Sequence, residues 1–338
     1  MADPVTVTLD SLQSGIVNRT VDFTTLETAF GPASLGIILV SHLPPTFPAL
    51  RLRLLTFASL LGNLPAQELA ALECPEAKYL VGWSCGKEKL ANDRPDTAKG
   101  SYYVNCAFYK DRSLEGAEGG ERYEGLREYT EGNIWPREEL LEGFRETFVE
   151  LCTLIIDTAG LVARACDRYA VAKIPNYTPG YLEHVVATST TTKARLLHYF
   201  PLPPSSTPAA PDSWCGTHLD HSCLTGLTSA MYTSSAAPST EIPCPDPRAG
   251  LYIQDRGGST VQVAIPRDCL AFQTGEALEV ITQGRFRAVP HFVRGCEVGG
   301  VARGTLAVFT QPNLWEMVGE DDFAAFAREI VGRNTNEG

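Results

Sequence analysis

The feature that most constrains the fold is a change of hydrophobic periodicity near Ala187. Before it, apolar residues recur with helical spacing, most clearly over residues 136–169, where Leu140, Phe144 and Phe148 share one helical face. After it, short β-branched and aromatic runs alternate with clusters of Gly, Pro, Ser and Asp. The chain is therefore expected to place helices first and short strands second.

The second half contains seven segments with the composition of strands: residues 194–200, 226–232, 250–255, 261–266, 269–275, 288–293 and 304–311. In the first half, we expect a strand, a helix and a strand between residues 5 and 40, then two helices separated at Gly62 and Pro65. The Glu- and Gly-rich residues 111–133 indicate a solvated loop. So many short strands favour a sandwich or barrel over a parallel α/β sheet.

Charge and composition argue against several kinds of partner. The 338 residues carry a net charge of −12, whereas nucleic-acid-binding surfaces usually show a basic excess. No apolar run is long enough to cross a bilayer, and the N-terminal sequence lacks the basic and apolar regions of a secretory signal. The ten cysteines include no CxxC pair, which indicates reduced thiols. We expect a cytoplasmic protein that binds neither nucleic acid nor membrane.

Three residues in the β-rich half form a candidate metal site. Side chains alternate along a strand, so His218 and Asp220 are expected to share a face, while His221 faces the other way and serves in packing or hydrogen bonding. His291 lies on another predicted strand of the same half. Two imidazoles and one carboxylate can occupy one face of an octahedral iron(II) ion.

Two cysteines flank this motif and raise the alternative of zinc. Cys215 and Cys223 lie eight residues apart, which is not the spacing of a zinc knuckle. We interpret both as packing residues.

Five segments together resemble the 2-oxoglutarate- and iron(II)-dependent oxygenases, in particular the plant and fungal small-molecule branch that is similar to isopenicillin N synthase. They are residues 25–44, NIWP at 133–136 with the helix after it, THLDHSCLTGL at 217–227, the hairpin at 249–266, and residues 269–293. The resemblance implies a mainly β fold with flanking α: a double-stranded β-helix, or jelly roll, braced by N-terminal helices and one long helix.

The resemblance also implies how the chain is divided. Residues 1–180 would form the helix-rich N-terminal region, residues 190–318 the catalytic jelly roll, and residues 319–338 a C-terminal helix and tail.

The family binds the distal carboxylate of 2-oxoglutarate with an Arg-x-Ser or Arg-x-Thr pair after the second histidine. Arg303 and Thr305 match this pair, and they share a face of a predicted strand. Arg294 is the rival, but it follows His291 by three residues and so has the opposite strand parity.

An Asn-x-Tyr motif often completes the cosubstrate pocket in this family. Tyr199 stands in the tyrosine position, with Leu197 where the family has asparagine. A shift of one residue would place Phe200 there instead and would remove the hydroxyl group.

The resemblance implies an enzyme that uses iron(II), 2-oxoglutarate and O2, with ascorbate as a candidate reductant. It would hydroxylate or desaturate a small organic molecule and release succinate and CO2. The resemblance does not fix the oligomeric state, and a monomer is favoured. Two alternatives stay open. One is a non-catalytic jelly-roll binding protein derived from the family, and the other is a zinc or manganese enzyme with the same three ligands.

Residues 79–103 are the most suggestive segment for the substrate. They combine aromatic and basic side chains, among them Trp83, Lys87, Lys89, Arg94 and Tyr103. The family's topology would put them near the entrance of the active site, where a carboxylated or phenolic molecule would fit. A solvated loop explains the charges as well.

Overall fold

The computed structural model describes residues 4–14, 21–87, 96–119, 121–123, 125–202 and 213–336, with the backbone alone for residue 121 and residues 331–336. Within this part of the chain, no helix is both long and apolar enough to cross a membrane.

A large mixed sheet forms the main wall of the molecule. Its strands are, in spatial order, β1 (Val5–Thr8), β2 (Ile37–Ser41), β12 (Leu270–Thr274), β7 (Leu224–Thr228), β14 (Val301–Thr310), β5 (Lys193–Tyr199), β4 (Lys99–Asn105) and β3 (Gly82–Cys85). The hairpin of β8 (Met231–Ser234) and β9 (Ala237–Ile242) extends this sheet through pairing of β8 with β14. Every pairing except that of β1 with β2 is antiparallel.

A smaller sheet packs against the inner face of the large one. Its strands are β11 (Thr260–Val263), β10 (Gly250–Gln254), β13 (His291–Arg294) and β6 (Cys215–His218). Apolar side chains from both sheets meet in shared clusters, for example Leu197 and Tyr199 with Val293. The two sheets therefore form the jelly roll that the sequence predicted.

The helices and the remaining short elements lie around this core. They are α1 (Leu9–Gln13), α2 (Phe23–Phe30), α3 (Phe47–Gly62), α4 (Ala66–Ala70), α5 (Arg127–Thr130), α6 (Phe144–Lys173), α7 (Tyr181–Thr188), α8 (Glu276–Ile281), α9 (Phe323–Asn336), three 3-10 turns at Pro75–Ala77, Cys106–Tyr109 and Glu121–Tyr123, and the two-residue strands β15 (Met317–Val318) and β16 (Asp321–Asp322).

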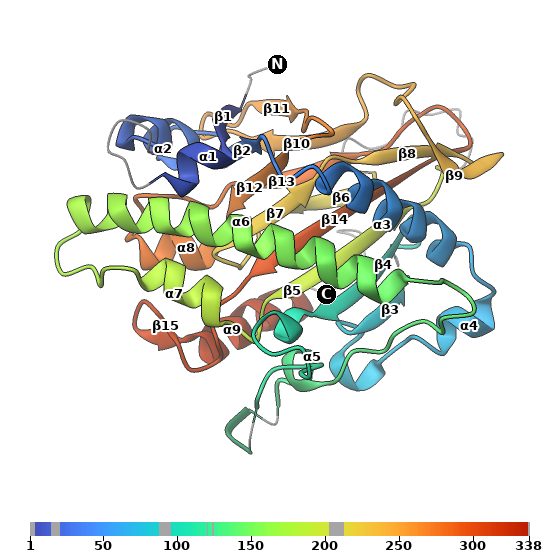
Figure 1. Ribbon diagram of the computed structural model, residues 1–338, viewed down its shortest axis with the longest axis horizontal. Coiled ribbons are helices and arrows are strands. Elements are labelled where there is room, and N and C mark those ends of the chain that lie inside the picture. The colour runs from blue at the N-terminus through green and yellow to red at the C-terminus, as the bar shows by residue number, and fades with distance from the viewer. Residues whose placement is uncertain are drawn as a thin grey trace.

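Helix α6 braces the outer face of the large sheet, and α3 lies beside it (Figure 1). Ile155 of α6 belongs to the same buried cluster as Leu306 and Val308 of β14. At Gly226 of β7, a Cβ atom would lie only 2.4 Å from Cγ2 of Ile155, so the close approach of helix and sheet requires glycine there. Helix α6 thus covers the outer face of the sheet, so a ligand site is expected on the inner face.

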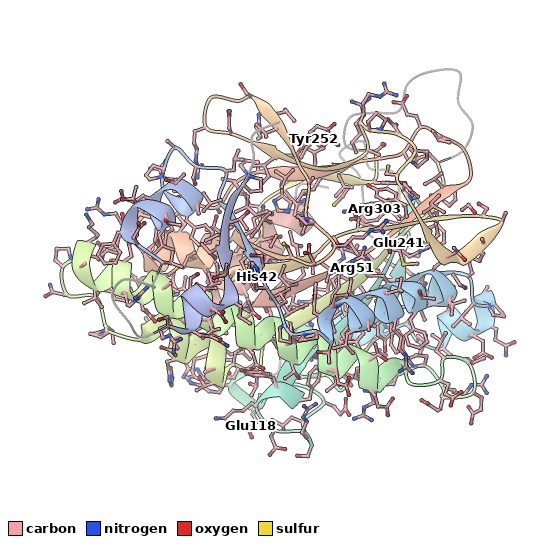
Figure 2. All side chains as sticks on the ribbon, turned by 45° about the horizontal axis from the view of Figure 1, so that its top comes forward. His42, Arg51, Glu118, Glu241, Tyr252 and Arg303 are labelled. Atoms are coloured by element: carbon pink, nitrogen blue, oxygen red, sulfur yellow. The ribbon has the colours of Figure 1, made fainter. Side chains whose placement is uncertain are left out.

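The β8–β9 hairpin is fastened to α3 by a buried ion pair. Arg51 Nη2 lies 2.9 Å from Glu241 Oε1 and also donates to the carbonyl of Ala230, and Figure 2 labels both members of the pair together with Arg303. Because β8 pairs with β14 beside Arg303, this contact fixes one wall next to that arginine.

The structure confirms the change from helix to strand and the predicted fold class, and it differs from the prediction in several details. The long helix begins at Phe144 rather than 136, because Gly143 before it has a left-handed φ of 75°. The predicted strand 226–232 is interrupted, so it contributes to both β7 and β8. The helix-rich interpretation of the first third missed β3 and β4, which extend the large sheet.

Candidate metal centre

The three predicted metal ligands lie together at the ends of two adjacent strands of the small sheet. His218 is the last residue of β6, His291 is the first of β13, and the two are paired across the strands. Asp220 lies two residues beyond the end of β6, so an irregular segment and not strand alternation brings it to the histidines. The premise of a continuous strand through Asp220 was wrong, although the convergence it predicted is present.

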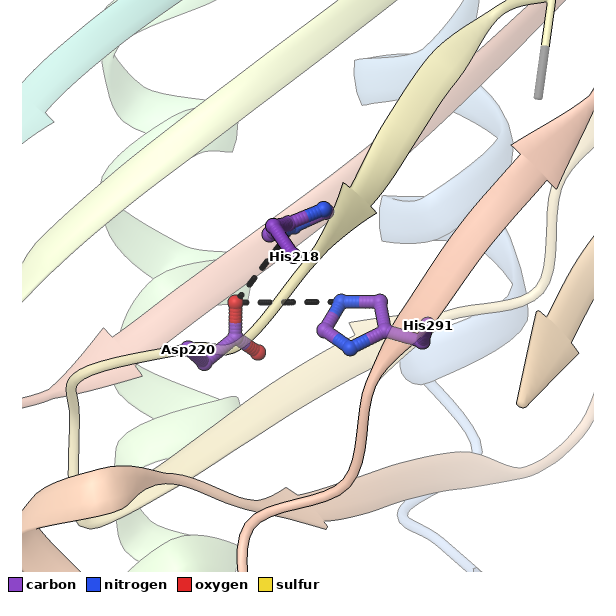
Figure 3. A group of neighbouring side chains, drawn as sticks. All are labelled: His218, Asp220 and His291. Atoms are coloured by element: carbon purple, nitrogen blue, oxygen red, sulfur yellow. Dashed lines mark ion pairs between the residues drawn. The ribbon is translucent and has the colours of Figure 1, made fainter. Parts of the chain in front are cut away.

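The geometry of the three side chains suits a single metal ion. Asp220 Oδ1 lies 3.8 Å from Nε2 of His218 and 3.8 Å from Nε2 of His291 (Figure 3). One ligand atom from each residue falls within 4.8 Å of the others. Asp220 and His291 are buried, whereas the His218 side chain is 41% exposed. The Asp220 and His291 side of the group is therefore buried in the protein, and the His218 side is accessible to solvent.

Hydrogen bonds orient each candidate ligand. His218 Nδ1 lies 2.8 Å from the carbonyl of Gly216, which can accept its hydrogen and leave the Nε2 lone pair for a metal. The hydroxyl of Thr225 donates to Asp220 Oδ2 at 2.6 Å, which leaves Oδ1 directed at the two imidazoles.

His291 has two polar neighbours at Nδ1. The carbonyl of Val289 lies 3.2 Å away, and the amide nitrogen of Gln273 lies 2.6 Å away. A metal at Nε2 requires Nδ1 to carry the hydrogen, and therefore to face acceptors. Val289 is one acceptor, and Gln273 Oε1, which has no partner among the described residues, becomes a second if the amide turns over.

Burial and the charges of neighbouring groups together set the protonation of the ligands. Burial lowers the pKa of His291 to about 4, and the neighbouring His218 contributes to that decrease, so His291 is the neutral imidazole that a metal needs. Burial alone would raise the pKa of Asp220, but the adjacent His291 and His218 outweigh it and hold that pKa below its ordinary value. A carboxylate and a neutral imidazole are thus ready for a cation.

Three residues close to the metal motif, His221, Cys223 and Cys215, make contacts of their own. His221 is half-buried, and its Nε2 lies 3.0 Å from the amide of Gln311, in keeping with a hydrogen-bonding role. Cys223 is buried in the main apolar cluster. Cys215 is buried between the sheets, with its sulfur 3.9 Å from His218 Nδ1 and 3.9 Å from Lys99 Nζ.

The predicted cosubstrate residues lie side by side on the inner face of the large sheet. Arg303 is paired with Tyr199, and Thr305 is paired with Leu197 two positions further along β14. The Arg303 guanidinium carbon lies 5.0 Å from the centre of the Tyr199 ring, and that ring packs on Trp214. The Thr305 hydroxyl lies 3.3 Å from the carbonyl of Thr228.

Arg303 is a buried cation without a complete set of acceptors. Only 6% of the residue is exposed, yet within the part of the chain that the structure describes its Nε and Nη1 have no hydrogen-bond partner. Burying a charge in this way is costly unless an anion meets it. The arginine therefore fits an external carboxylate.

The two rivals for these roles lie elsewhere. Arg294 lies on the same face of β13 as Phe292, whose ring stacks on Tyr252. The Nη2 of Arg294 donates to Glu297 at 3.2 Å. Phe200 follows β5 and packs on His198, on the opposite side from Tyr199.

The chain was compared with known proteins. No family model matches the sequence, and no curated protein is found as a relative. Solved structures do match. A full-length Neurospora crassa protein, in complex with alpha-KG and 5-formyluracil, is 18% identical, with a TM-score of 0.61 over 92% of this chain and 85% of that one. A Caulobacter crescentus protein assigned to the 2OG-Fe(II) oxygenase family is 20% identical, with a TM-score of 0.65 over 92% and 88%.

A third match is the rice dioxygenase for auxin oxidation, DAO, which is 16% identical with a TM-score of 0.62 over 98% of this chain and 96% of that one. The chain has the fold of the 2-oxoglutarate- and iron(II)-dependent oxygenases. The resemblance seen in its motifs is thereby confirmed at the level of the fold.

The sequence interpretation missed the residues that hold the ligands in place. Thr225 and Gln273 are polar residues within buried strands, and they are paired across β7 and β12. A polar side chain at an inward position of an otherwise apolar strand is the signal that would have found them.

Proposed function

We propose that the protein is a non-haem iron(II)- and 2-oxoglutarate-dependent oxygenase that hydroxylates or desaturates a small organic molecule and releases succinate and CO2. The observation that carries this proposal is the buried Arg303, whose guanidinium lacks a full set of partners among the described residues and lies in the same jelly roll as a His-Asp-His group able to hold a metal. A metal-binding cupin would need the three ligands but has no use for the arginine.

Structures of the same fold support the choice of cosubstrate and of a small substrate. The Neurospora crassa protein has also been crystallised with alpha-KG and thymine, and JOX2 with 2OG, Fe and JA. These ligands belong to those proteins. They support the proposal because the present chain offers ligand groups of the matching kind.

His218, Asp220 and His291 would hold the iron. Iron(II), O2 and the 2-oxo acid together supply the oxidising power. The chain itself binds and orients: Arg303 offers a planar fork to the distal carboxylate of the oxo acid. Thr305, beside it on the same face, adds a hydroxyl, and the Tyr199 ring supports the guanidinium and helps to exclude water.

The ligand set is tested by iron binding in protein prepared without oxygen. His218→Ala, Asp220→Ala and His291→Ala should each lose iron and substrate-stimulated succinate release, while circular dichroism shows a retained fold. His221→Ala is the matched control and should keep the iron. Unchanged iron stoichiometry in all three ligand variants would reject the site.

The same preparation separates the alternatives. Zinc or manganese bound in preference to iron would favour a different metalloenzyme. Iron and 2-oxoglutarate binding without succinate release across a broad metabolite screen would favour a non-catalytic binding protein.

A further inference from the structure

The segment that the sequence singled out for the substrate, residues 79–103, is described only in part. Trp83 is buried, Lys87 forms an ion pair with Glu73, and Lys89 and Arg94 lie outside the described residues. The strands around the predicted cosubstrate residues, β7, β8, β9 and β14, are described throughout, and their pairing contains an irregularity.

Strand β14 has two successive partners on one edge, and an extra residue separates them. Leu227 of β7 is paired with Ala307, and Met231 of β8 is paired with Gly304. Three residues, 228–230, therefore lie opposite only two residues of β14. An extra residue of this kind forms a β-bulge, and bulges are common next to active sites, where they redirect a side chain.

The bulge decides which side chain of β8 faces Arg303. Side chains alternate along a strand, so without the extra residue Met231 would share the inner face with Leu227. With the extra residue, Met231 lies in the main apolar cluster on the outer face, and Tyr232 is paired with Arg303. Tyr232 packs on the cluster between the two sheets. Arg303 thus lies between Tyr232 and Tyr199 in one row of the inner face.

Arg51 of α3 holds the bulge in place. Its Nε donates to the carbonyl of Ser229 at 3.1 Å, and its Nη2 donates to the carbonyl of Ala230 at 2.7 Å. Both residues lie outside the ladder with β14, so the guanidinium supplies the donors that their carbonyls need. Glu241 of β9 accepts from Nη2 at 2.9 Å and from Nη1 at 3.3 Å, and these bonds fix the plane of the guanidinium.

The bulge also reaches the second cosubstrate residue. The Thr305 hydroxyl lies 3.3 Å from the carbonyl of Thr228, and the Leu306 N–H donates to the Thr228 hydroxyl at 3.1 Å. Thr228 is followed directly by the two residues that Arg51 holds. The contacts of Arg51 therefore act on neighbours of both Arg303 and Thr305.

The burial of the Arg51–Glu241 pair favours a role in position over a role in stability. Only 3% of the Arg51 side chain and 14% of the Glu241 side chain are exposed. The cost of desolvating a buried ion pair offsets much of its attraction, so the pair adds little net stability compared with apolar residues of the same size. The geometry of a guanidinium with a carboxylate is strict, and it suits the task of fixing strands.

We propose that Arg51, held by Glu241, is a positioning residue for the distal carboxylate of the cosubstrate (Figure 2 labels Arg51, Glu241 and Arg303). It fixes the bulge at residues 228–230 and thereby sets the direction of Arg303 and Thr305 and keeps Tyr232 beside Arg303. This inference rests on the proposed function. It places determinants of 2-oxoglutarate affinity on a helix and a hairpin behind the residues that would touch the cosubstrate.

The test compares the affinities of iron(II)-loaded protein for 2-oxoglutarate and for 2-oxobutyrate, which lacks the distal carboxylate, without oxygen. Arg51→Lys keeps the charge beside Glu241, but an ammonium lacks the planar fork that serves two carbonyls and a carboxylate together. The preference for 2-oxoglutarate should fall about tenfold, which is within the usual range for coupled residues. Glu241→Asp keeps the charge but shortens the side chain, and it should lower the preference by roughly threefold.

Both variants conserve charge, so a fall in preference reports position and not electrostatic attraction. Iron affinity should change less than about twofold, because the metal ligands belong to the small sheet and the segment after β6. Asp167→Asn is the control for a purely structural loss. Asp167 of α6 accepts from Tyr177 and from the N–H groups of Leu182 and Glu183, so this variant should be less stable to denaturant but keep the preference.

The outcomes separate this inference from the proposed function. An unchanged preference in the folded Arg51→Lys and Glu241→Asp proteins would overturn the role of Arg51, and Glu241→Asp decides alone if Arg51→Lys does not fold. An equal fall of preference in Asp167→Asn, or a fall of iron affinity in parallel with the preference, would overturn it as well. Wild-type protein that binds both oxo acids equally would instead reject the assignment of Arg303 in the proposed function.

Discussion

Lys193 of β5 and Arg303 of β14 lie on adjacent strands and are equally buried, but they differ in how many of their donors have a hydrogen-bond partner. Each is 6% exposed. Lys193 Nζ donates to the carbonyls of Leu80 and Glu128 and to the side chain of Asn105, at 2.6 to 2.9 Å. Nε and Nη1 of Arg303 have no acceptor among the described residues.

We interpret the difference as a division of roles, in which Lys193 serves the fold and Arg303 serves the proposed ligand. Three acceptors match the three hydrogens of an ammonium group, so the chain itself completes the surroundings of Lys193. Burial lowers the pKa of Lys193, and the charge of Glu128 acts in the opposite direction. The Arg303 guanidinium lies in a site that the described part of the chain leaves incomplete, and burying such a group is costly unless an anion completes the site.

The largest expected effect comes from Arg303→Met. Removing one partner of a desolvated charge pair typically costs about 2–5 kcal/mol, which is roughly a 30-fold or greater loss of 2-oxoglutarate affinity. Stability without ligand should stay the same or rise, because an unpaired buried charge is removed. Titration of iron-loaded protein and denaturant unfolding measure the two effects. Arg303→Lys should recover only part of the affinity, and Arg294→Met is the control that should change it little.

Lys193→Met should do the reverse. It leaves three buried acceptors without a donor and should lower the free energy of unfolding by roughly 2–4 kcal/mol. Affinity of the folded fraction for 2-oxoglutarate should hardly change. A stable Lys193→Met protein that binds the oxo acid poorly would contradict the assignment of Lys193 to the fold.

The pH dependence of stability sharpens the contrast. The folded-state pKa of Lys193 lies below that of an exposed lysine, so the unfolded chain binds more protons between the two values. Stability should therefore rise as the pH increases from neutral into that interval. Unfolding curves at several alkaline pH values should show a smaller rise in Lys193→Met.

Gln273 is a second buried polar residue with an atom, Oε1, that has no partner among the described residues. Gln273→Leu tests whether this side chain supports metal binding through His291. Loss of a hydrogen-bond partner behind a metal ligand usually costs about 10- to 100-fold in metal affinity, and we expect a loss of that size for iron. Gln273→Glu keeps an acceptor for His291 and should retain more affinity. Iron dialysis against a competing chelator provides the measurement, and equal affinity of Gln273→Leu and wild-type protein would show that Val289 alone orients His291.

The smallest effect is expected from Tyr199→Phe. The structure stacks the Tyr199 ring under the Arg303 guanidinium, and that contact survives loss of the hydroxyl group. The affinity for 2-oxoglutarate should fall by less than about 1 kcal/mol. Tyr199→Leu removes the ring and should cost more. A larger loss in Tyr199→Phe would show that the hydroxyl itself binds the cosubstrate, as the family motif implies.

The sequence predicted those parts of the site whose residue type and spacing are constrained by chemistry. His218, Asp220 and His291 could be found because two imidazoles and a carboxylate close together in the β-rich half have few other uses. Arg303 could be found because Thr305 follows it two residues later, as in the Arg-x-Thr motif of the family that the chain resembles. Their roles as ligands stay predictions.

The remainder depended on contacts between distant segments. Strands β3 and β4 were missed because their sequences, GWSC and KGSYYVN, lack a clear apolar alternation, and they become strands by pairing with β5 and with each other. Lys193 and Arg195 differ by two positions on one strand. Their different contacts, Lys193 with Asn105 and Arg195 with Ser101, are set by the residues that β4 places opposite them.

The central claim is that Arg303 awaits the distal carboxylate of an oxo acid, and a comparison of two oxo acids tests it most directly. 2-Oxobutyrate offers a metal the same carboxylate and keto oxygen as 2-oxoglutarate but has no second carboxylate. Both are titrated into wild-type, iron(II)-loaded protein without oxygen, with the visible charge-transfer band as the readout. We predict that 2-oxoglutarate binds at least about 30-fold more tightly. Equal affinity for the two acids would contradict the account.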